Sequence, residues 1–276
     1  MEQFLWLIPL GFAVGTFGTL IGAGGGFILV PVLLLLYPHS SPESITSISL
    51  ATVFFNALSG SIAYARMKRI DFKSGWVFAV ATIPGSILGA ITTSWIPRRA
   101  FDIIFGIILT AIAILLFVKP KPGARREIAV TRLGLGKYFT REMIDAEGTQ
   151  YTFSYNRPLG IVISVFVGYF SSLLGIGGGI IHVPALVHFL NFPVHLATAT
   201  SHFILAIMAL SGSIVHLATG TLRSGATITI GLAIGVLLGA QLGAKLSSRI
   251  HGVGIIKSLA VALCLVGVRI FIMGLF

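Results

Sequence analysis

The sequence predicts an all-α integral membrane protein built from two homologous halves. Of the 276 residues, 55% are apolar and only 10% are charged. Soluble domains carry about 25% charged residues, so this chain could not cover its apolar surface by folding in water. The chain also repeats itself: a glycine-rich segment at 22–31 returns at 175–184, and the six residues 57–62 return unchanged at 209–214. Such a repeat indicates a duplicated structural unit.

Apolar runs separated by short polar seams predict the membrane helices. Runs of about 20 residues suit helices that cross a hydrocarbon core of roughly 30 Å. Strands are not expected, because the runs lack alternation and lipid tolerates only helices or closed barrels. The runs of the first half lie at 4–37, 44–65, 74–96 and 101–118. The runs of the second half lie at 158–190, 195–218, 225–246 and 255–275.

The first run of each half is too long for one helix. A helix over residues 4–37 would be about 50 Å long, and each of its three successive glycines would cost about 1 kcal/mol relative to alanine. We therefore expect a helix, a glycine turn at 22–26 and a shorter helix over 27–37, with the same arrangement in the second half. Pro31 and Pro184 would then lie in the first turns of the short helices, where no amide hydrogen is missed.

The organisation along the chain is a first membrane repeat at 1–118, a connector at 119–157 and a second membrane repeat at 158–276. The connector holds eight basic and four acidic residues, and it is expected in the cytoplasm because Lys and Arg concentrate in cytoplasmic loops. Within it, residues 143–153 could form a small β-hairpin around Gly148. A disordered loop is the alternative.

The distribution of basic residues favours two inverted halves of five segments each. The basic seam at 66–73 has a counterpart at 218–223 that keeps one base, and opposite orientation of the halves would produce this loss. Both termini would then lie outside. Arg98 and Arg99 would also face outward, against the charge rule. If each broken hairpin crosses only once, the chain has eight spans in two parallel sets of four, and this alternative stays open.

The two glycine breaks are the main candidate site. Glycines also let helices approach closely, and this explains scattered pairs better than it explains a triplet. A triplet breaks the helix and leaves free backbone amides at the positive end of the next helix dipole, where an anion can bind without a charged side chain. The expected binding glycines are Gly24, Gly25, Gly26, Gly177, Gly178 and Gly179.

Polar side chains on the run after each break are further candidates. Ser49 and Asn56 share one helical face with Thr46 and Thr52. An amide facing lipid would be costly, so Asn56 should face the interior. Hydroxyl groups in a membrane helix can instead bond to their own backbone, which is the structural alternative for this face.

The second half contributes Thr200, Ser201 and His202, and it holds six of the seven histidines. His182 lies three residues past the second glycine triplet. Histidine titrates near neutral pH, so His182 and His202 are candidates for substrate contact or proton coupling. A metal site is not expected, because no HExxH pair occurs and partner carboxylates are missing.

Composition argues against several other classes. The acidic residues lie outside the apolar runs or, for Asp102, at the very start of one, which argues against a cation pump built on buried carboxylates. The net charge of +11 is assigned to loops that meet lipid headgroups rather than to binding of nucleic acid. Cys264 is the sole cysteine, so neither a disulfide framework nor a cysteine metal cluster is expected. No cofactor is expected.

These residues resemble the TauE/SafE family of membrane permeases, often called sulfite exporters. The resemblance covers nearly the whole chain. It is carried by Gly22-x-Gly24-Gly25-Gly26-x4-Pro31, by Gly175-x-Gly177-Gly178-Gly179-x4-Pro184 and by His195-x2-Thr198-Ala199-Thr200-Ser201-His202. It implies a multi-pass protein of the cell membrane that moves small sulfur-containing anions such as sulfite and organosulfonates, without identifying one substrate.

We therefore expect a secondary transporter that holds a small sulfur oxyanion between the two glycine breaks near the membrane centre. No ATP-binding loop is present in the sequence. The alternative is an integral membrane enzyme that uses the histidine-rich second half, which would not require a matching break in the first half. The expected partners are the anionic substrate and membrane lipid. Protons as the coupling ion, a homo-oligomer and the direction of transport are left open.

Overall fold

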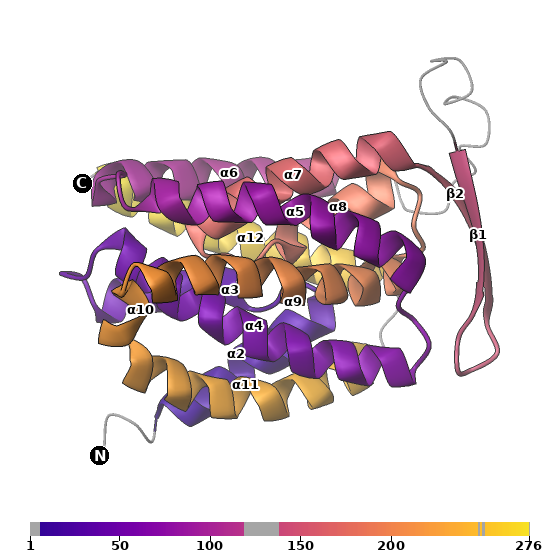
Figure 1. Ribbon diagram of the computed structural model, residues 1–276, viewed down its shortest axis with the longest axis horizontal. Helices are drawn as coiled ribbons and strands as arrows, with labels where there is room; N and C mark the ends of the chain where they lie inside the picture. The colour runs from indigo at the N-terminus through magenta and orange to yellow at the C-terminus, as the bar shows by residue number, and fades with distance from the viewer. Residues whose placement is uncertain (1–5, 119–137, 248, 250–251, 276) are drawn as a thin grey trace.

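The computed structural model describes residues 6–118, 138–247, 249 and 252–275, which form helices and one β-hairpin (Figure 1). The helices before the hairpin are α2 (Leu7–Ile21), α3 (Gly26–Leu36), α4 (Pro42–Arg66), α5 (Phe72–Thr93) and α6 (Arg98–Val118). Those after it are α7 (Arg157–Leu174), α8 (Gly179–Phe189), α9 (Val194–Ala218), α10 (Thr221–Ser224), α11 (Ala226–Ser247) and α12 (Gly252–Leu275). Among the described residues, α4, α5, α7, α9 and α11 are long and apolar enough to cross a membrane. The all-α membrane class is confirmed, and the short helix α10 was not expected.

Each half begins with two helices separated by the predicted glycine break. Gly22 caps α2 and α3 begins at Gly26, while Gly175 caps α7 and α8 begins at Gly179. The two capping glycines are left-handed, with φ of 78° and 67°. This conformation ends a helix and is readily adopted only by glycine. The sequence therefore located both breaks correctly.

The expected position of the two prolines was wrong. Pro31 and Pro184 are each the sixth residue of their helix, in the second turn rather than the first. The reason is that the last glycine of each triplet already begins the short helix. Because proline has no amide hydrogen, the carbonyls of Phe27 and Ile180 lose their usual helical donor.

The first helix of each half packs against a helix of the other half. In the first half α2 packs on α11 of the second, and in the second half α7 packs on α5 of the first. Matching glycines permit both contacts: a Cβ added at Gly85 would lie 2.1 Å from the carbonyl oxygen of Val165, and one added at Gly235 would lie 2.2 Å from that of Ile8. The scattered glycine pairs thus serve close helix packing, as expected.

The start of α2 and the end of α12 lie at one end of the helical bundle, and the β-hairpin lies at the other (Figure 1). An odd number of segments in each half produces this placement, whereas four spans in each half would bring the connector to the side of the chain ends. The arrangement supports the inverted interpretation, whose orientation in a membrane stays a prediction.

Arg98 lies at the end of the bundle opposite the hairpin. This is the end expected to face outward, where the charge rule disfavours an arginine. Its guanidinium donates hydrogen bonds of 3.2 Å to the carbonyls of Leu34 and Ser40, at the end of α3 and beyond it. Asp102 pairs with it at 3.0 Å. Arg98 therefore caps the last carbonyls of a short helix, and a carboxylate neutralises its charge.

The connector contains a β-hairpin, which was one of the two structures expected there; the other was a disordered loop. Strand β1 (Tyr138–Ile144) pairs antiparallel with β2 (Gln150–Asn156), and the turn between them contains Gly148 with φ of 82°. The hairpin is longer than the predicted 143–153, and β2 continues directly into α7. The remainder of the connector, 119–137, lies outside the described residues.

Candidate functional site

The two glycine breaks touch each other. A Cβ added at Gly26 would lie 2.6 Å from the carbonyl oxygen of Gly175, and one added at Gly179 would lie 2.1 Å from that of Gly22. These distances are far below any real Cβ contact, so the backbones of the two breaks lie in direct contact. Segments about 150 residues apart in the sequence therefore meet at one place.

The other glycines of the triplets face mostly apolar side chains. Gly24 and Gly177 both face Val53 of α4, and Gly24 also faces Leu205 of α9. Val53 and Leu205 lie 152 positions apart, the same shift as between the repeated segments 57–62 and 209–214. The long central helix of each half thus packs at the breaks through an equivalent residue. Gly25 faces Val14, and Gly178 faces Met208 and Ser171.

Two serines bind the breaks in a reciprocal way. The hydroxyl of Ser49 on α4 donates to the carbonyl oxygen of Gly175 at 2.6 Å. The hydroxyl of Ser201 on α9 donates to the carbonyl oxygen of Gly22 at 3.4 Å. Each capping glycine therefore accepts a hydrogen bond from the half to which it does not belong, and these bonds connect the two halves.

Several backbone amides at the breaks have no hydrogen-bond partner among the described residues. Within the described part of the chain, no hydrogen bond uses the amides of Gly26 and Phe27 at the start of α3, or those of Gly178 and Ile180 at the start of α8. Unpaired amides are usual in the first turn of a helix, which also carries the positive end of the helix dipole. Both short helices thus begin with donors that suit an anion.

A buried polar cluster lies beside the first break. Thr19 donates to the side-chain oxygen of Asn56 at 3.1 Å and lies 3.2 Å from Nε2 of His202. Tyr64 donates to the carbonyl oxygen of Thr19 at 2.7 Å, and its ring packs edge-on against His202. The Thr19 hydroxyl has one hydrogen, which goes to Asn56, so Nε2 of His202 is the donor. Nδ1 of His202 then carries the lone pair.

Four buried polar side-chain atoms around the breaks have no hydrogen-bond partner among the described residues. They are Asn56 Nδ2, Ser171 Oγ, Thr198 Oγ1 and His202 Nδ1. Thr198 packs against Gly22, and Ser171 lies 3.2 Å from a Cβ added at Gly178. An unpaired buried polar group costs about 1–3 kcal/mol, so these four groups are candidates for hydrogen bonds to a polar ligand at the breaks.

Two predicted site residues face elsewhere. Nε2 of His182 lies 3.2 Å from the Ser164 hydroxyl of α7, and its ring lies near Phe78. The Thr200 hydroxyl accepts a hydrogen bond of 3.0 Å from the amide of Asp71, at the start of α5. In the described structure the side-chain hydrogen bonds of these two residues are thus with Ser164 of α7 and with Asp71 at the start of α5, although the amide of His182 donates to the carbonyl oxygen of Gly178 at 2.8 Å.

Of the four polar side chains on one face of α4, two bond to the backbone of their own helix and two reach other segments. Thr46 and Thr52 donate to the carbonyls of Glu43 and Ile48 in their own helix, at 3.0 and 2.8 Å. Ser49 instead reaches the second half, and Asn56 binds Thr19 in the interior. The backbone alternative therefore holds for the two threonines only.

Thr19 and Ser171 were not predicted from the sequence. Thr19 connects Asn56, Tyr64 and His202, although it lies in the helix before the break rather than the helix after it. For Thr19 a signal was present: a hydroxyl residue stands three positions before each capping glycine, Thr19 before Gly22 and Ser172 before Gly175. This spacing does not point to Ser171.

Other features of the described chain offer less to an anion. A groove of about 230 Å³ between α7 and α8 is lined by apolar residues such as Val162, Phe166 and Phe170. Among the described residues, no group of three His, Cys, Asp or Glu side chains is placed to share a metal ion. The glycine breaks and the cluster around Thr19 are thus the candidate site.

The chain is similar to known membrane transporter proteins. The family described as "Sulfite exporter TauE/SafE" matches residues 7–270. A probable membrane transporter protein of Bacillus subtilis (strain 168), YunE, is 36% identical over 224 residues, which cover 79% of this chain and 80% of that protein. A probable membrane transporter protein of Methanocaldococcus jannaschii is 28% identical over 228 residues, covering 79% of this chain and 76% of that protein. No solved structure matches the chain.

Proposed function

Because the chain belongs to the sulfite exporter TauE/SafE family, we propose that it is a secondary transporter of small sulfur oxyanions such as sulfite or organosulfonates. Family membership makes the chain a multi-pass membrane transporter and not an enzyme. The hypothesis of an enzyme in the histidine-rich second half is therefore set aside. The substrate class and its site are the proposal.

The observation that carries the proposal is the contact between the two glycine breaks, where unpaired donors gather. The amides at the starts of α3 and α8 and the free groups of Asn56 and Thr198 can each donate a hydrogen bond to an oxyanion. Each half supplies one break and one central helix. A site made in this way opens toward one side or the other when the halves move relative to each other.

The described conformation is closed around this site. Gly26 and Gly179 touch the opposite backbone, and Ser49, Asn56 and His202 are fully buried. The substrate therefore reaches its donors only after the halves separate along this contact. Glycine at these positions allows the closed state, because any side chain would hold the breaks apart.

His202 is the proposed proton site. In its neutral form Nε2 donates to Thr19, so the unpartnered Nδ1 can accept a proton but cannot donate to an anion. Protonation turns Nδ1 into a charged donor. Binding of an anion and of a proton would then favour each other, which is the linkage that proton-coupled anion transport requires.

The test is flux of labelled sulfite into proteoliposomes, with a panel of sulfonates as competitors and with or without an imposed pH gradient. Saturable flux that the sulfonates inhibit supports the substrate class, and stimulation by the gradient supports proton coupling. Saturable flux without stimulation leaves a facilitator and removes the role of His202. Absence of flux for every sulfur anion overturns the substrate class.

A further inference from the structure

The β-hairpin is joined to one half of the protein and grips the other half. Its second strand runs directly into α7, and the Asn156 side chain caps that helix by accepting from the amide of Leu159 at 3.0 Å. The hairpin is therefore a rigid extension of the second half. Its strongest polar contacts, however, are with the loop between α4 and α5 of the first half.

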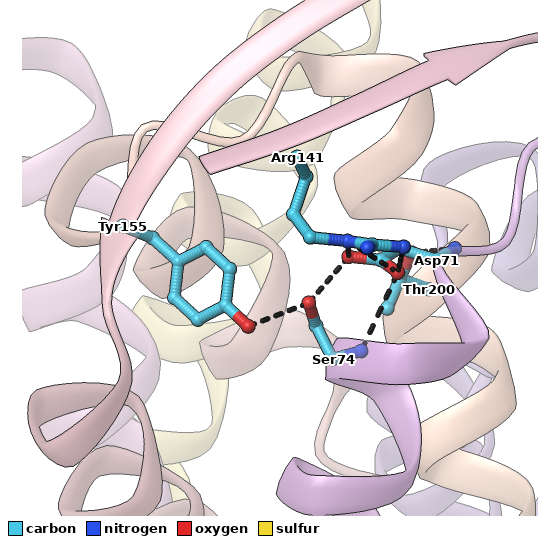
Figure 2. A network of polar contacts seen from close by, with 5 residues as sticks. All are labelled: Asp71, Ser74, Arg141, Tyr155 and Thr200. Carbon is cyan, nitrogen blue, oxygen red and sulfur yellow. Dashed lines mark hydrogen bonds and ion pairs between the residues drawn. The ribbon is translucent and has the colours of Figure 1, made fainter. Parts of the chain in front are cut away.

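The first of these contacts joins Arg141 of β1 to Asp71 (Figure 2). Nε of Arg141 lies 3.2 Å from both carboxylate oxygens of Asp71, and Nη2 lies 2.9 Å from one of them. Asp71 is fully buried, whereas the Arg141 side chain keeps 22% of its surface exposed. A charge-assisted pair with several hydrogen bonds of this kind is strong and specific in its geometry.

Asp71 also connects this pair to α9, the helix that carries Thr200 and Ser201. It caps α5 by accepting from the amide and hydroxyl of Ser74 (Figure 2). The Ser74 oxygen also lies 2.7 Å from the Tyr155 hydroxyl of β2, which is the donor of this bond because the one hydroxyl hydrogen of Ser74 goes to Asp71. The amide of Asp71 donates to Thr200, which directly precedes Ser201 at the first break. A short chain of contacts therefore runs from the hairpin to the glycine break.

A second contact lies at the tip of the hairpin. Asp145 pairs with the buried Arg69 at 3.3 Å, and Glu147 pairs with the same arginine at 3.2 Å. The amide of Ala146 donates to the carbonyl oxygen of Met67 at 3.0 Å. Both anchors on the membrane part, Arg69 and Met67, belong to the first half.

The hairpin also packs on its own half. Phe153 and Tyr155 lie against Phe192 in the loop between α8 and α9, with ring centroids 4.4 and 5.3 Å apart. Asn191 in this loop donates to the carbonyl oxygen of Ser154 at 3.4 Å. These contacts fix the hairpin to the loop between α8 and α9, so we expect it to move with the second half.

At the opposite end of the bundle, the position equivalent to Asp71 makes a simpler contact between the halves. Thr221 lies 14 residues before Gly235, as Asp71 lies 14 residues before Gly85. Thr221 donates one hydrogen bond of 2.7 Å to Glu43 of the first half. Among the described residues, the two ends therefore differ in that the hairpin adds ion pairs between the halves at one end.

We propose that the β1–β2 hairpin is a strap that keeps the substrate site closed at its own end, and that the Arg141–Asp71 pair is its latch. The proposal rests on the proposed function, because separation of the halves is what the strap prevents. When the second half tilts, the latch and the contacts of Asp145 and Ala146 must break before water and substrate reach the break.

The test places a reporter cysteine at the break, Thr198→Cys, in a chain whose native cysteine is removed by Cys264→Ala. A small water-soluble methanethiosulfonate reagent is applied to inside-out membrane vesicles, where the hairpin end is expected to face the reagent. Arg141→Gln should raise the labelling rate about tenfold if the latch contributes as charge-assisted hydrogen bonds usually do. Lys73→Gln, an exposed charge on the first turn of α5, is the control and should leave the rate unchanged.

A disulfide tests the same strap from the other direction. Met67→Cys with Ala146→Cys can bridge the hairpin to the first half, because the two residues share a backbone hydrogen bond. Oxidation should abolish both labelling and flux of a labelled sulfonate, which unlike sulfite does not cleave disulfides, and a reductant should restore them. Thr140→Cys with Ser154→Cys bridges the two strands within the hairpin and should leave flux unchanged.

Labelling does not depend on the substrate, so the strap can be judged even if no sulfur anion is carried. Arg141→Lys keeps the charge without the planar fork, and an intermediate rate for this variant separates loss of the latch from a folding defect. Faster labelling in Arg141→Gln with reversible closure by the disulfide supports the strap. An unchanged labelling rate in Arg141→Gln, or full flux through the oxidised Met67–Ala146 pair, overturns it.

Discussion

The hydroxyl of Ser49 donates a hydrogen bond of 2.6 Å to the carbonyl oxygen of Gly175, the residue that ends α7 in the other half of the protein. Ser201 and Gly22 form the reciprocal pair at 3.4 Å. Each break is thus held by the central helix of the opposite half. The position of either break depends on both halves, as expected for a single substrate site at their contact.

We predict that Ser49→Ala lowers thermal stability. The substitution leaves the buried carbonyl of Gly175 without this donor, and an unsatisfied buried group costs about 1–3 kcal/mol. The control is Ser47→Ala, which is buried on the same helix but donates to the carbonyl of Ser44 in its own helix. Thermal unfolding in detergent should show a lower midpoint for Ser49→Ala than for Ser47→Ala. Equal midpoints would mean that the bond between the halves contributes nothing to stability.

Thr198→Val should weaken substrate binding without loss of stability. The Thr198 hydroxyl is buried and has no partner in the described part of the chain, so its removal costs no protein hydrogen bond. If it donates to the substrate, its loss should weaken binding about tenfold, the effect of one hydrogen bond. Thr46→Val is the control, because the equivalent Thr46 hydroxyl is bonded to Glu43. Concentration dependence of sulfite flux gives the measurement, and similar half-saturation in both variants would exclude Thr198 from the site.

The sequence predicted the elements of the site better than it predicted their contacts. Successive glycines cannot continue a helix, so both breaks were located correctly from local chemistry alone. Thr200, Ser201 and His202 were expected to act together, yet consecutive helical residues point about 100° apart. In the structure they face Asp71, Gly22 and Thr19, respectively. The hydrogen-bond partner of each of these three side chains is set by packing between segments distant in the sequence, which the periodicity of the sequence does not reveal.

Gly26→Ala and Gly179→Ala should impair the same activity. The added methyl groups would lie 2.6 and 2.1 Å from backbone atoms of the opposite break, and overpacking of this kind costs about 1–3 kcal/mol. Gly220→Ala is the control: this glycine has φ of 82° and no atom within 4 Å of an added Cβ, so it reports backbone strain alone. Flux in proteoliposomes should fall in both break variants and persist in the control. A defect in only one of them would contradict a site shared by the halves.

His202→Gln should remove the response to a pH gradient while leaving flux measurable. A glutamine amide can still donate to Thr19, as Nε2 of His202 does, but it takes up no proton at neutral pH. The exposed His39→Gln serves as the control. Flux is compared with and without an imposed gradient, and stimulation should disappear in His202→Gln only. If the gradient still stimulates that variant, another group couples the proton.

The ion pair at the tip of the hairpin predicts a dependence on acid pH. Burial disfavours the charged form of Asp145, but the backbone amides of Thr149 and Glu147 and the Arg69 guanidinium outweigh burial and lower the pKa of this carboxyl. A lowered pKa in the docked state means that Asp145 stabilises docking fully above its free pKa of about 4. This contribution is lost as the pH falls through the lowered value.

Hydrogen exchange of residues 138–156, corrected for the intrinsic rate at each pH, measures this effect. In the native chain, protection should be constant from pH 7 to about 5 and should decrease below about pH 4. Asp145→Asn should be less protected already at pH 7, because the amide replaces a carboxylate that binds Arg69 at 3.3 Å. Its protection should then change less with acid. Glu142→Gln, on the exposed side of β1, should behave like the native chain. If Asp145→Asn loses protection with acid as steeply as the native chain does, another carboxylate controls docking, and Asp71 beneath Arg141 becomes the next to test.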